Sequence, residues 1–159
     1  MQSSRPRPLY LGFSSQKGGV GKSTLAEILS SMLYYEEGIS LFVVDCDLTQ
    51  DSFFKLRERE RGTIGVDPAL TAYMQAYFHQ LQRRSYRIIK ARPEEAVARA
   101  GALVAKHPEE GYQLVVFDFP GHAETRELLE LSLEMDYIFS PLEPDIQSMV
   151  AYLSYAKSI

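Results

Sequence analysis

The sequence of 159 residues has a single cysteine, Cys46, and no long apolar run. One cysteine excludes an internal disulfide and a metal site built from cysteines alone. No apolar stretch approaches the roughly 18 residues that a membrane span requires, and no apolar segment of a signal peptide follows the basic start, MQSSRPRP. These absences predict a cytoplasmic protein with no transmembrane segment.

An excess of positive charge is also missing, because the formal net charge is −4. This balance argues against nucleic-acid binding through overall charge, although a local patch can still provide it. With 45% apolar and 24% charged residues, the composition is that of a globular protein and not of a disordered chain. The length predicts a single domain over residues 1–159, with residues 1–8 as a flexible N-terminal segment.

Short apolar runs alternate with helical patterns along the chain. Strands are expected at residues 9–13, 39–44, 86–89, 114–117 and 137–139. Helices are expected from Ser23, from Pro68 after the cap residue Asp67, from Pro93, and after each of the last two strands. The apolar face of the helix from Ser23 is expected to consist of Leu25, Ile28, Leu29, Met32 and Leu33. The apolar residues of the helix from Pro68 are expected to form a buried face. The charged stretch 51–62 is expected to be a solvated, in part helical, connection. This order predicts an α/β fold, a mostly parallel sheet with helices on both faces.

A glycine-rich loop joins the first strand to the first helix and has the sequence KGGVGKST, residues 17–24. Its glycines allow consecutive backbone N–H groups to surround a phosphate chain, and the following helix directs its positive end at the same phosphates. Lys22 is placed to bind the β and γ phosphates, and the Ser23 hydroxyl to bind Mg²⁺. A nucleotide-binding P-loop is therefore predicted over the residues Lys17, Gly18, Gly19, Val20, Gly21, Lys22, Ser23 and Thr24.

Three aspartates follow buried strands. Asp45 and Asp47 end the second predicted strand, and Asp118 ends the strand at 114–117. Because parallel strands end at one edge of a sheet, these carboxylates should converge beside the P-loop. There they can hold Mg²⁺ or orient an attacking water. The alternative is that they cap the helices that follow.

The KGGVGKST loop resembles the deviant Walker A motif of the ParA/MinD family of P-loop ATPases. The resemblance implies that Lys17 reaches across a dimer to the partner's nucleotide. It also implies that Asp47 serves hydrolysis and that Asp118, with Pro120 and Gly121, forms the Walker B strand and switch loop. Lys17, Lys22 and Asp47 are thus the predicted catalytic residues, and Ser23, Asp47 and Asp118 the predicted Mg²⁺ ligands, direct or through water.

The resemblance further implies a P-loop NTPase-like fold whose family domain continues beyond residue 159, so the fold is expected to be C-terminally incomplete. The layout of residues 52–110 resembles the ParA-like proteins of Bacteroidetes conjugative transposons. The implied function is an ATP-binding and ATP-hydrolysing homodimerisation switch with slow, activator-stimulated turnover. It would serve the partition, positioning, maintenance or transfer of DNA such as a plasmid or conjugative transposon.

Two other functions stay open from the sequence. One is a non-catalytic scaffold whose conformation depends on bound nucleotide, and the other is a P-loop kinase, because Tyr152 and Tyr155 resemble the tyrosine cluster of bacterial autokinases. The nitrogenase-reductase branch needs two cysteines per subunit for a shared iron–sulfur cluster, which Cys46 alone does not supply.

A basic segment is the candidate for nonspecific DNA contact, with a solvated surface as the alternative. Its basic residues are Arg83, Arg84, Arg87, Lys90 and Arg92. The alternating charges of residues 55–61 are expected to form a mixed surface that faces solvent.

Overall fold

A single parallel sheet organises the chain in this computed structural model. The described residues are 7–15, 19–48, 52–121, 125–141, 149–150, 153–154 and 156–157. The five strands are β1 (Leu9–Phe13), β2 (Leu41–Asp45), β3 (Arg87–Lys90), β4 (Leu114–Asp118) and β5 (Tyr137–Phe139). Their order is β3-β2-β4-β1-β5, and every neighbouring pair is parallel.

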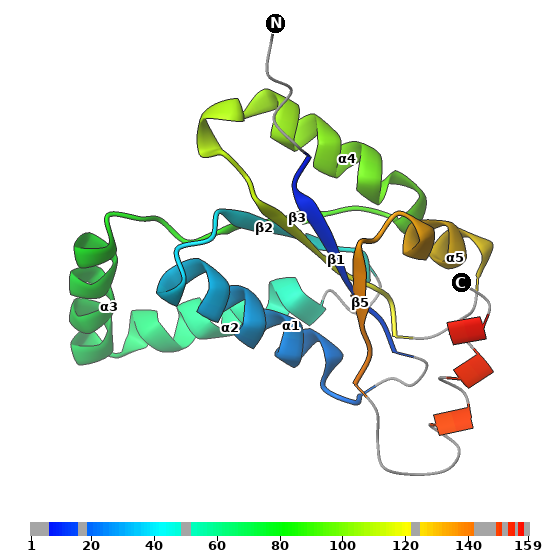
Figure 1. Ribbon diagram of the computed structural model, residues 1–159. Coiled ribbons are helices and arrows are strands. Elements are labelled where there is room, and N and C mark those ends of the chain that lie inside the picture. The colour runs from blue at the N-terminus through cyan, green and yellow to red at the C-terminus, as the bar shows by residue number, and fades with distance from the viewer. Residues whose placement is uncertain are drawn as a thin grey trace, which may run out of the picture.

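Helices cover both faces of this sheet (Figure 1). They are α1 (Lys22–Ser31), the π-helix η1 (Met32–Glu36), α2 (Ser52–Val66), α3 (Pro68–Leu81), α4 (Pro93–Lys106), the 3-10 helix η2 (Pro108–Glu110) and α5 (Arg126–Leu133). α4 and α5 pack on one face, and α1 and α2 on the other. The predicted α/β fold with a parallel sheet and helices on both faces is therefore confirmed.

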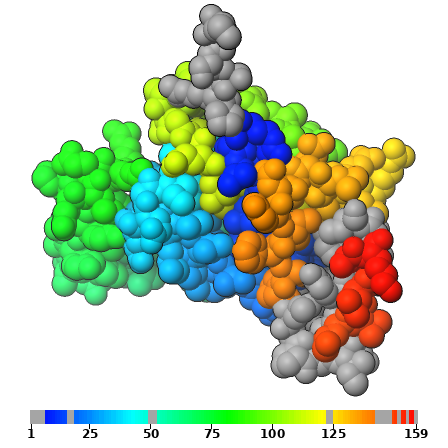
Figure 2. All heavy atoms as spheres, in the orientation of Figure 1, coloured from blue at the N-terminus to red at the C-terminus, as the bar shows by residue number. Residues whose placement is uncertain are grey.

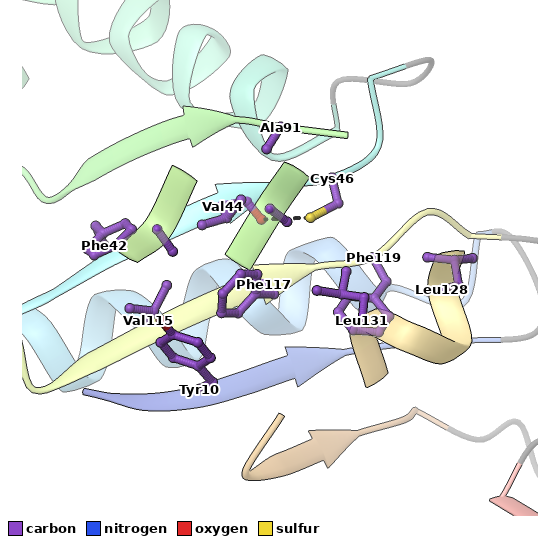
Figure 3. Packing of buried hydrophobic residues seen from close by; sticks show 12 residues of the cluster. Tyr10, Phe42, Val44, Cys46, Ala91, Val115, Phe117, Phe119, Leu128 and Leu131 are labelled. Atoms are coloured by element: carbon purple, nitrogen blue, oxygen red, sulfur yellow. Dashed lines mark hydrogen bonds between the residues drawn. The ribbon is translucent and has the colours of Figure 1, made fainter. Parts of the chain in front are cut away.

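Two apolar clusters fill the layers between sheet and helices, because successive residues of each strand point to opposite faces. Tyr10, Phe42 and Phe117 lie in the cluster under α4 and α5, which Figure 3 shows, whereas Leu11 and Val43 lie in the cluster under α1 and α2. The central strands β2 and β4 are buried along their whole length. Their continuous apolar runs are typical of strands covered on both faces.

The apolar runs located the strands well. β1 and β5 span the predicted residues, β4 extends the prediction by Asp118, and β2 and β3 are displaced by one or two residues from the predicted bounds. α4 has the predicted start at Pro93, with Ala96 and Ala100 fully buried.

The orientation of α1 differs from the expected apolar face. Leu25, Ile28 and Met32 are exposed, whereas Ala26 and Ser30 are fully buried against the sheet. Small side chains let this helix lie close to β1 and β4, whereas Leu29 and Leu33 of the predicted face are partly buried against the cluster under α1 and α2, as expected.

The charged stretch, expected to be a solvated and in part helical connection, is helical from residue 52 on as part of the 15-residue helix α2, and most of its described side chains are exposed, although two are buried. Phe53 is fully buried, and Arg57 is only 9% exposed, with its guanidinium 4.3 Å from the centre of the Tyr86 ring. The same finding corrects the expected solvent-facing surface at Arg57, which stacks on an aromatic side chain in the core instead.

α3 begins where the sequence predicts. Asp67 accepts hydrogen bonds from the backbone N–H groups of Ala69 (2.9 Å) and Leu70 (3.0 Å), and Pro68 occupies the first turn. The helix packs against α2 and projects from one side of the molecule (Figure 2). The sequence predicts a buried face for this helix, but the residues of that face are only half-buried, and no residue of α3 is fully buried. The predicted face consists of Leu70, Met74, Tyr77, Phe78 and Leu81.

The two ends of the described chain differ in what the structure shows of them. Arg7, which we expected in a flexible segment, forms two 2.9 Å hydrogen bonds with the Asp136 carboxylate. Near the C-terminus, residues 149–150, 153–154 and 156–157 are helical, in line with the last predicted helix, and Tyr152 and Tyr155 lie outside the described residues. Among the residues that the structure describes, no helix is both long and apolar enough to cross a membrane.

The cap of α3 gives a stability prediction. Replacing Asp67 with Ala removes both hydrogen bonds to the first turn, so the free energy of unfolding should fall by about 1 kcal/mol. Urea unfolding measures the change. Asp67→Asn keeps the capping oxygen and should retain most of the stability; an equal loss in both variants would contradict the capping role.

Candidate functional site

The loop between β1 and α1 has the backbone that its glycines suggest. Gly19 and Gly21 have φ angles of 81° and 82°, in the left-handed region that other residues rarely adopt. α1 begins at the next residue, Lys22, and its first turn contains no acidic residue. The amide groups at this positive helix end are thus compatible with an anion. Lys17 and Gly18 lie outside the described residues.

One register row brings the key strand ends together. Phe13 of β1 pairs with Asp118 of β4, Asp118 pairs with Asp45 of β2, and Asp45 pairs with Lys90 of β3. All four residues end their strands at the same edge of the sheet. The predicted convergence of Asp45 and Asp118 is therefore a direct consequence of strand register.

Lys22 is buried and ion-paired with Asp118. Its ammonium group donates hydrogen bonds to Asp118 Oδ1 and, at 3.2 Å, to the Ser23 hydroxyl. Burial raises the pKa of Asp118, and the charge of Lys22 acts in the opposite direction. Asp118 Oδ2 is buried and has no hydrogen-bond partner in the described part of the chain. The Ser23 side chain also acts to lower the pKa of Asp118, so the hydroxyl and the carboxylate belong to one site.

Asp45 holds the backbone that follows β2. Its two carboxylate oxygens accept hydrogen bonds from the backbone N–H groups of Asp47 (3.1 Å) and Phe54 (3.2 Å). Burial, followed by the neighbouring charge of Asp118, raises the pKa of Asp45 to about 6. The sequence left open whether Asp45 binds Mg²⁺ or water, or caps the following helix. Its hydrogen bond to Phe54 is of the capping kind, because it holds the first turn of α2.

Asp47 lies in a cleft of about 360 Å³ in front of the P-loop. Gly19, Gly21, Lys22, Ser23 and Thr24 form one wall, and Gly121, after β4, contributes to the lining. Asp47 is only 5% exposed. The cleft thus combines five of the predicted nucleotide-binding residues with the predicted catalytic carboxylate, and Asp118 lies behind it.

The opposite wall contains residues that the sequence reading missed. Lys55, Leu56 and Arg59 of α2 line the same cleft. The available signal was the spacing of Lys55 and Arg59, four residues apart and a few residues beyond Asp47, which puts both on one helix face.

The candidate DNA-contact residues are divided among different environments. Arg83 donates to the backbone carbonyls of Tyr34 (2.8 Å) and Gly38 (2.7 Å), so its guanidinium braces the end of η1. Arg87 lies 3.7 Å from a Glu110 carboxylate oxygen. Arg84 and Arg92 are exposed, and the Lys90 ammonium lies 4.2 Å from the centre of the Phe54 ring.

The P-loop and the ends of β1, β2 and β3 lie within a match to a known protein family. Residues 10–117, more than half of the chain, match the ParA family model, described as NUBPL iron-transfer P-loop NTPase. The chain belongs to the ParA family of P-loop NTPases. In this ParA-family chain, the match includes the P-loop, Asp47 and α2, and it ends at the residue before Asp118.

Solved structures support the same fold at low sequence identity. A plasmid partition protein from Borrelia burgdorferi bound to AMPPNP has a TM-score of 0.66 and 17% identity, over 96% of this chain and 70% of that one. The septum site-determining protein MinD from Pyrococcus horikoshii, complexed with Mg-ADP, has a TM-score of 0.57 and 20% identity, over 96% and 66%. Chloroplast FtsY from Physcomitrella patens has a TM-score of 0.55 and 16% identity, over 99% and 49%.

The ParA-family chain therefore spans about two thirds of the partition and MinD structures and about half of FtsY. No curated protein shows significant similarity to the sequence.

A carboxyl pair links α1 to α2 behind the cleft. Glu27 of α1 is only 8% exposed, and its Oε1 has no hydrogen-bond partner among the described residues. Burial, and then the neighbouring Glu60 of α2, raises the pKa of Glu27 to about 7, although Arg57 and Arg59 act in the opposite direction. The folded protein thus keeps a proton on Glu27 at pH values where an unfolded chain has lost it.

This raised pKa predicts a pH-dependent stability. Because the folded pKa of an acid is raised, the favourable contribution of Glu27 is present at low pH and is lost as the pH rises from about 4.5 to about 7. Glu27→Gln removes the ionisable group, so the variant should gain about 2 kcal/mol relative to the parent between about pH 5 and about pH 8. Urea unfolding at both pH values measures this difference. The exposed Glu36→Gln is the control, and a Glu27→Gln variant that tracks the parent at both pH values would contradict the assignment.

Proposed function

We propose that this chain is a MgATP-dependent dimerisation switch of the ParA/MinD type. The observation that carries the proposal is the buried group formed by Lys22, Ser23 and Asp118 at the glycine loop, where a hydroxyl and an unpartnered carboxylate oxygen lie beside a lysine ammonium. This arrangement offers both a phosphate-binding cation and oxygen ligands for a metal.

The residues fit Mg²⁺ bound together with a nucleotide. The part of the chain that the structure describes has no group of three or more His, Cys, Asp or Glu residues that would hold a metal ion by themselves. Mg²⁺ commonly uses one or two protein oxygens and completes its shell with water and phosphate oxygens. We assign Ser23 and Asp118 to this role, with Asp47 acting directly or through water. When bound, the ion would neutralise charge on the β and γ phosphates.

ATP would bind along the loop from Lys17 to Thr24. Backbone amides of the loop and the start of α1 would surround the phosphates, and Lys22 would contact the β and γ phosphates. Lys22 is now held by Asp118, so phosphate oxygens must share or replace that partner. The structures bound to AMPPNP and Mg-ADP support nucleotide binding by this fold.

Asp47 is the proposed catalytic carboxylate. It lies in the cleft with the P-loop residues, where a carboxylate can orient a water toward the γ-phosphate. Asp45 is fully buried and its oxygens accept from two backbone amides, which leaves Asp47 as the carboxylate of this segment that faces the cleft.

Dimerisation would complete the site. Two subunits would close over two nucleotides, Lys17 of each would neutralise charge at the other's phosphates, and hydrolysis would release the dimer. We propose slow hydrolysis that a partner protein stimulates, with a role in the partition, positioning or maintenance of DNA. Arg84, Lys90 and Arg92 remain the candidate DNA contacts. Iron transfer is not part of this proposal, because the one cysteine, Cys46, is 2% exposed and packed in the core.

The two lysines of the loop should have separable roles. Lys22→Ala should weaken MgATP binding by about 100-fold or more, because it removes the buried charge at the phosphates. Lys17→Ala should still bind ATP as a monomer but should neither dimerise nor turn over. Calorimetry, light scattering and phosphate release measure these three properties, with GTP as the competing nucleotide.

Circular dichroism must accompany the Lys22 variant, since it leaves Asp118 without its cation. Hydrolysis by Lys17→Ala at the parent rate would disprove the role across the dimer. Nucleotide binding and dimerisation by the parent without turnover, even with candidate activators present, would favour the scaffold function.

Asp47→Ala should bind MgATP and accumulate as an ATP-bound dimer, because the step that releases the dimer is blocked. Light scattering with ATP present measures the assembly, and Asp47→Asn tests the same loss with little change in side-chain size. A variant that remains monomeric with ATP bound would count against the hydrolytic role of Asp47.

A further inference from the structure

α2 carries four basic residues, and two of them are neutralised within the helix. Arg57 lies 3.9 Å from a Glu60 carboxylate oxygen, and Arg61 lies 3.3 Å from a Glu58 carboxylate oxygen. Arg57 also stacks on Tyr86 in the core. These residues share one side of α2, since they are four positions apart. Their charges are thus balanced by the same helix.

The other two basic residues, Lys55 and Arg59, are different. Both are exposed, both line the phosphate cleft, and neither forms an ion pair with another described residue. They are also four positions apart, which places them together on the face of α2 that is turned to the P-loop.

The charge balance of the cleft makes this placement significant. Lys22 is already ion-paired with Asp118, and Asp47 adds a negative charge to the lining. Lys55 and Arg59 therefore provide positive charge in the described cleft that no ion pair with a described carboxylate neutralises, although the charge of Arg59 also acts on the buried carboxyl group of Glu27. Although the net charge of the chain is −4, two cationic side chains thus lie together in the cleft where phosphates are expected to bind.

The position of these cations is fixed from the strand edge. Phe54, next to Lys55, donates its backbone N–H to Asp45, and Phe53 is fully buried. The first turn of α2 is thus anchored to β2 and to the core. Lys55 and Arg59 therefore lie on a helix whose first turn is hydrogen-bonded to the end of β2.

We propose that Lys55 and Arg59 form a second cationic wall of the cleft, which binds the phosphate chain of a nucleoside triphosphate from within the same subunit. This inference rests on the proposed nucleotide-binding function. It differs from the role of Lys17, which acts across the dimer, because the α2 wall operates in a monomer. The α2 residues and the P-loop line the same cleft, so bound phosphates would meet cations of α2 as well as the P-loop amides and Lys22.

The test compares Lys55→Ala/Arg59→Ala with Arg61→Ala, an exposed residue of the same helix that does not line this cleft. Calorimetry measures binding of MgATP, MgADP, AMP and inorganic tripolyphosphate at low protein concentration. Each removed cation should weaken ATP and tripolyphosphate binding by about tenfold. The loss should be smaller for ADP and smallest for AMP, and the salt dependence of ATP binding should become shallower. Arg61→Ala should bind all four ligands like the parent.

Lys55→Arg/Arg59→Lys separates charge from helix packing, since it should restore most of the tripolyphosphate affinity. Unchanged ATP and tripolyphosphate binding by the double alanine variant, with the parent binding both, would overturn the α2 wall and leave the proposed function intact. An equal loss for AMP and ATP would also overturn it, because the effect would not follow phosphate charge. If the parent binds neither ATP nor tripolyphosphate, both proposals fail; if it binds tripolyphosphate through these residues but not ATP, the wall is supported and the ATP assignment is contradicted.

Discussion

The burial of two carboxylates side by side is the constraint on which the site depends. Asp45 and Asp118 are directly opposite each other on β2 and β4, and both are fully buried. Burying an ionised carboxylate without compensation is unfavourable, and a second one nearby increases the cost. The structure compensates the two differently: Lys22 provides a cation to Asp118, and two backbone amides donate to Asp45. The P-loop and the start of α2 are thereby attached to the same pair of strand ends.

α2 consequently has two structural roles. One side completes the core with Phe53 and Arg57, and the other side closes the phosphate cleft. Farther along, the helix also borders a second cavity of about 530 Å³, which has Tyr35, Tyr77 and Phe78 in its lining. Arg59 lines both hollows, so this helix joins the phosphate cleft to an aromatic cavity between α1 and α3.

The sequence predicted the strands and the P-loop because their signals are local. Buried parallel strands appear as continuous apolar runs, and the glycines with Lys22 and Ser23 have a fixed order between a strand and a helix. α1 and α2 were harder because their orientation depends on the neighbouring sheet. On α1 the small residues Ala26 and Ser30 face the strands, which a search for large apolar residues does not reveal.

On α2 the alternating charges suggested a solvated surface. In a helix, however, residues four positions apart share a face, so Lys55 and Arg59 both line the phosphate cleft, whereas Arg57 and Arg61 line only the second cavity, which Arg59 also reaches. Which side meets the cleft follows from the anchoring of α2 to Asp45, a contact nine residues apart in the chain that no local pattern encodes. The site was therefore predictable in its P-loop and aspartates, but not in its second wall.

The hydrogen bonds of Asp45 have a consequence for how function is read from mutations in this segment. One of its carboxylate oxygens fixes the backbone of the cleft carboxylate Asp47, and the other fixes the helix that carries the opposite wall. A substitution at Asp45 would release both Asp47 and the start of α2, so a loss of the proposed activity in such a variant would not identify Asp45 as a reacting group. Asp45 is fully buried and does not line the cleft, so its role is to position Asp47 and the start of α2 and not to take part in the chemistry.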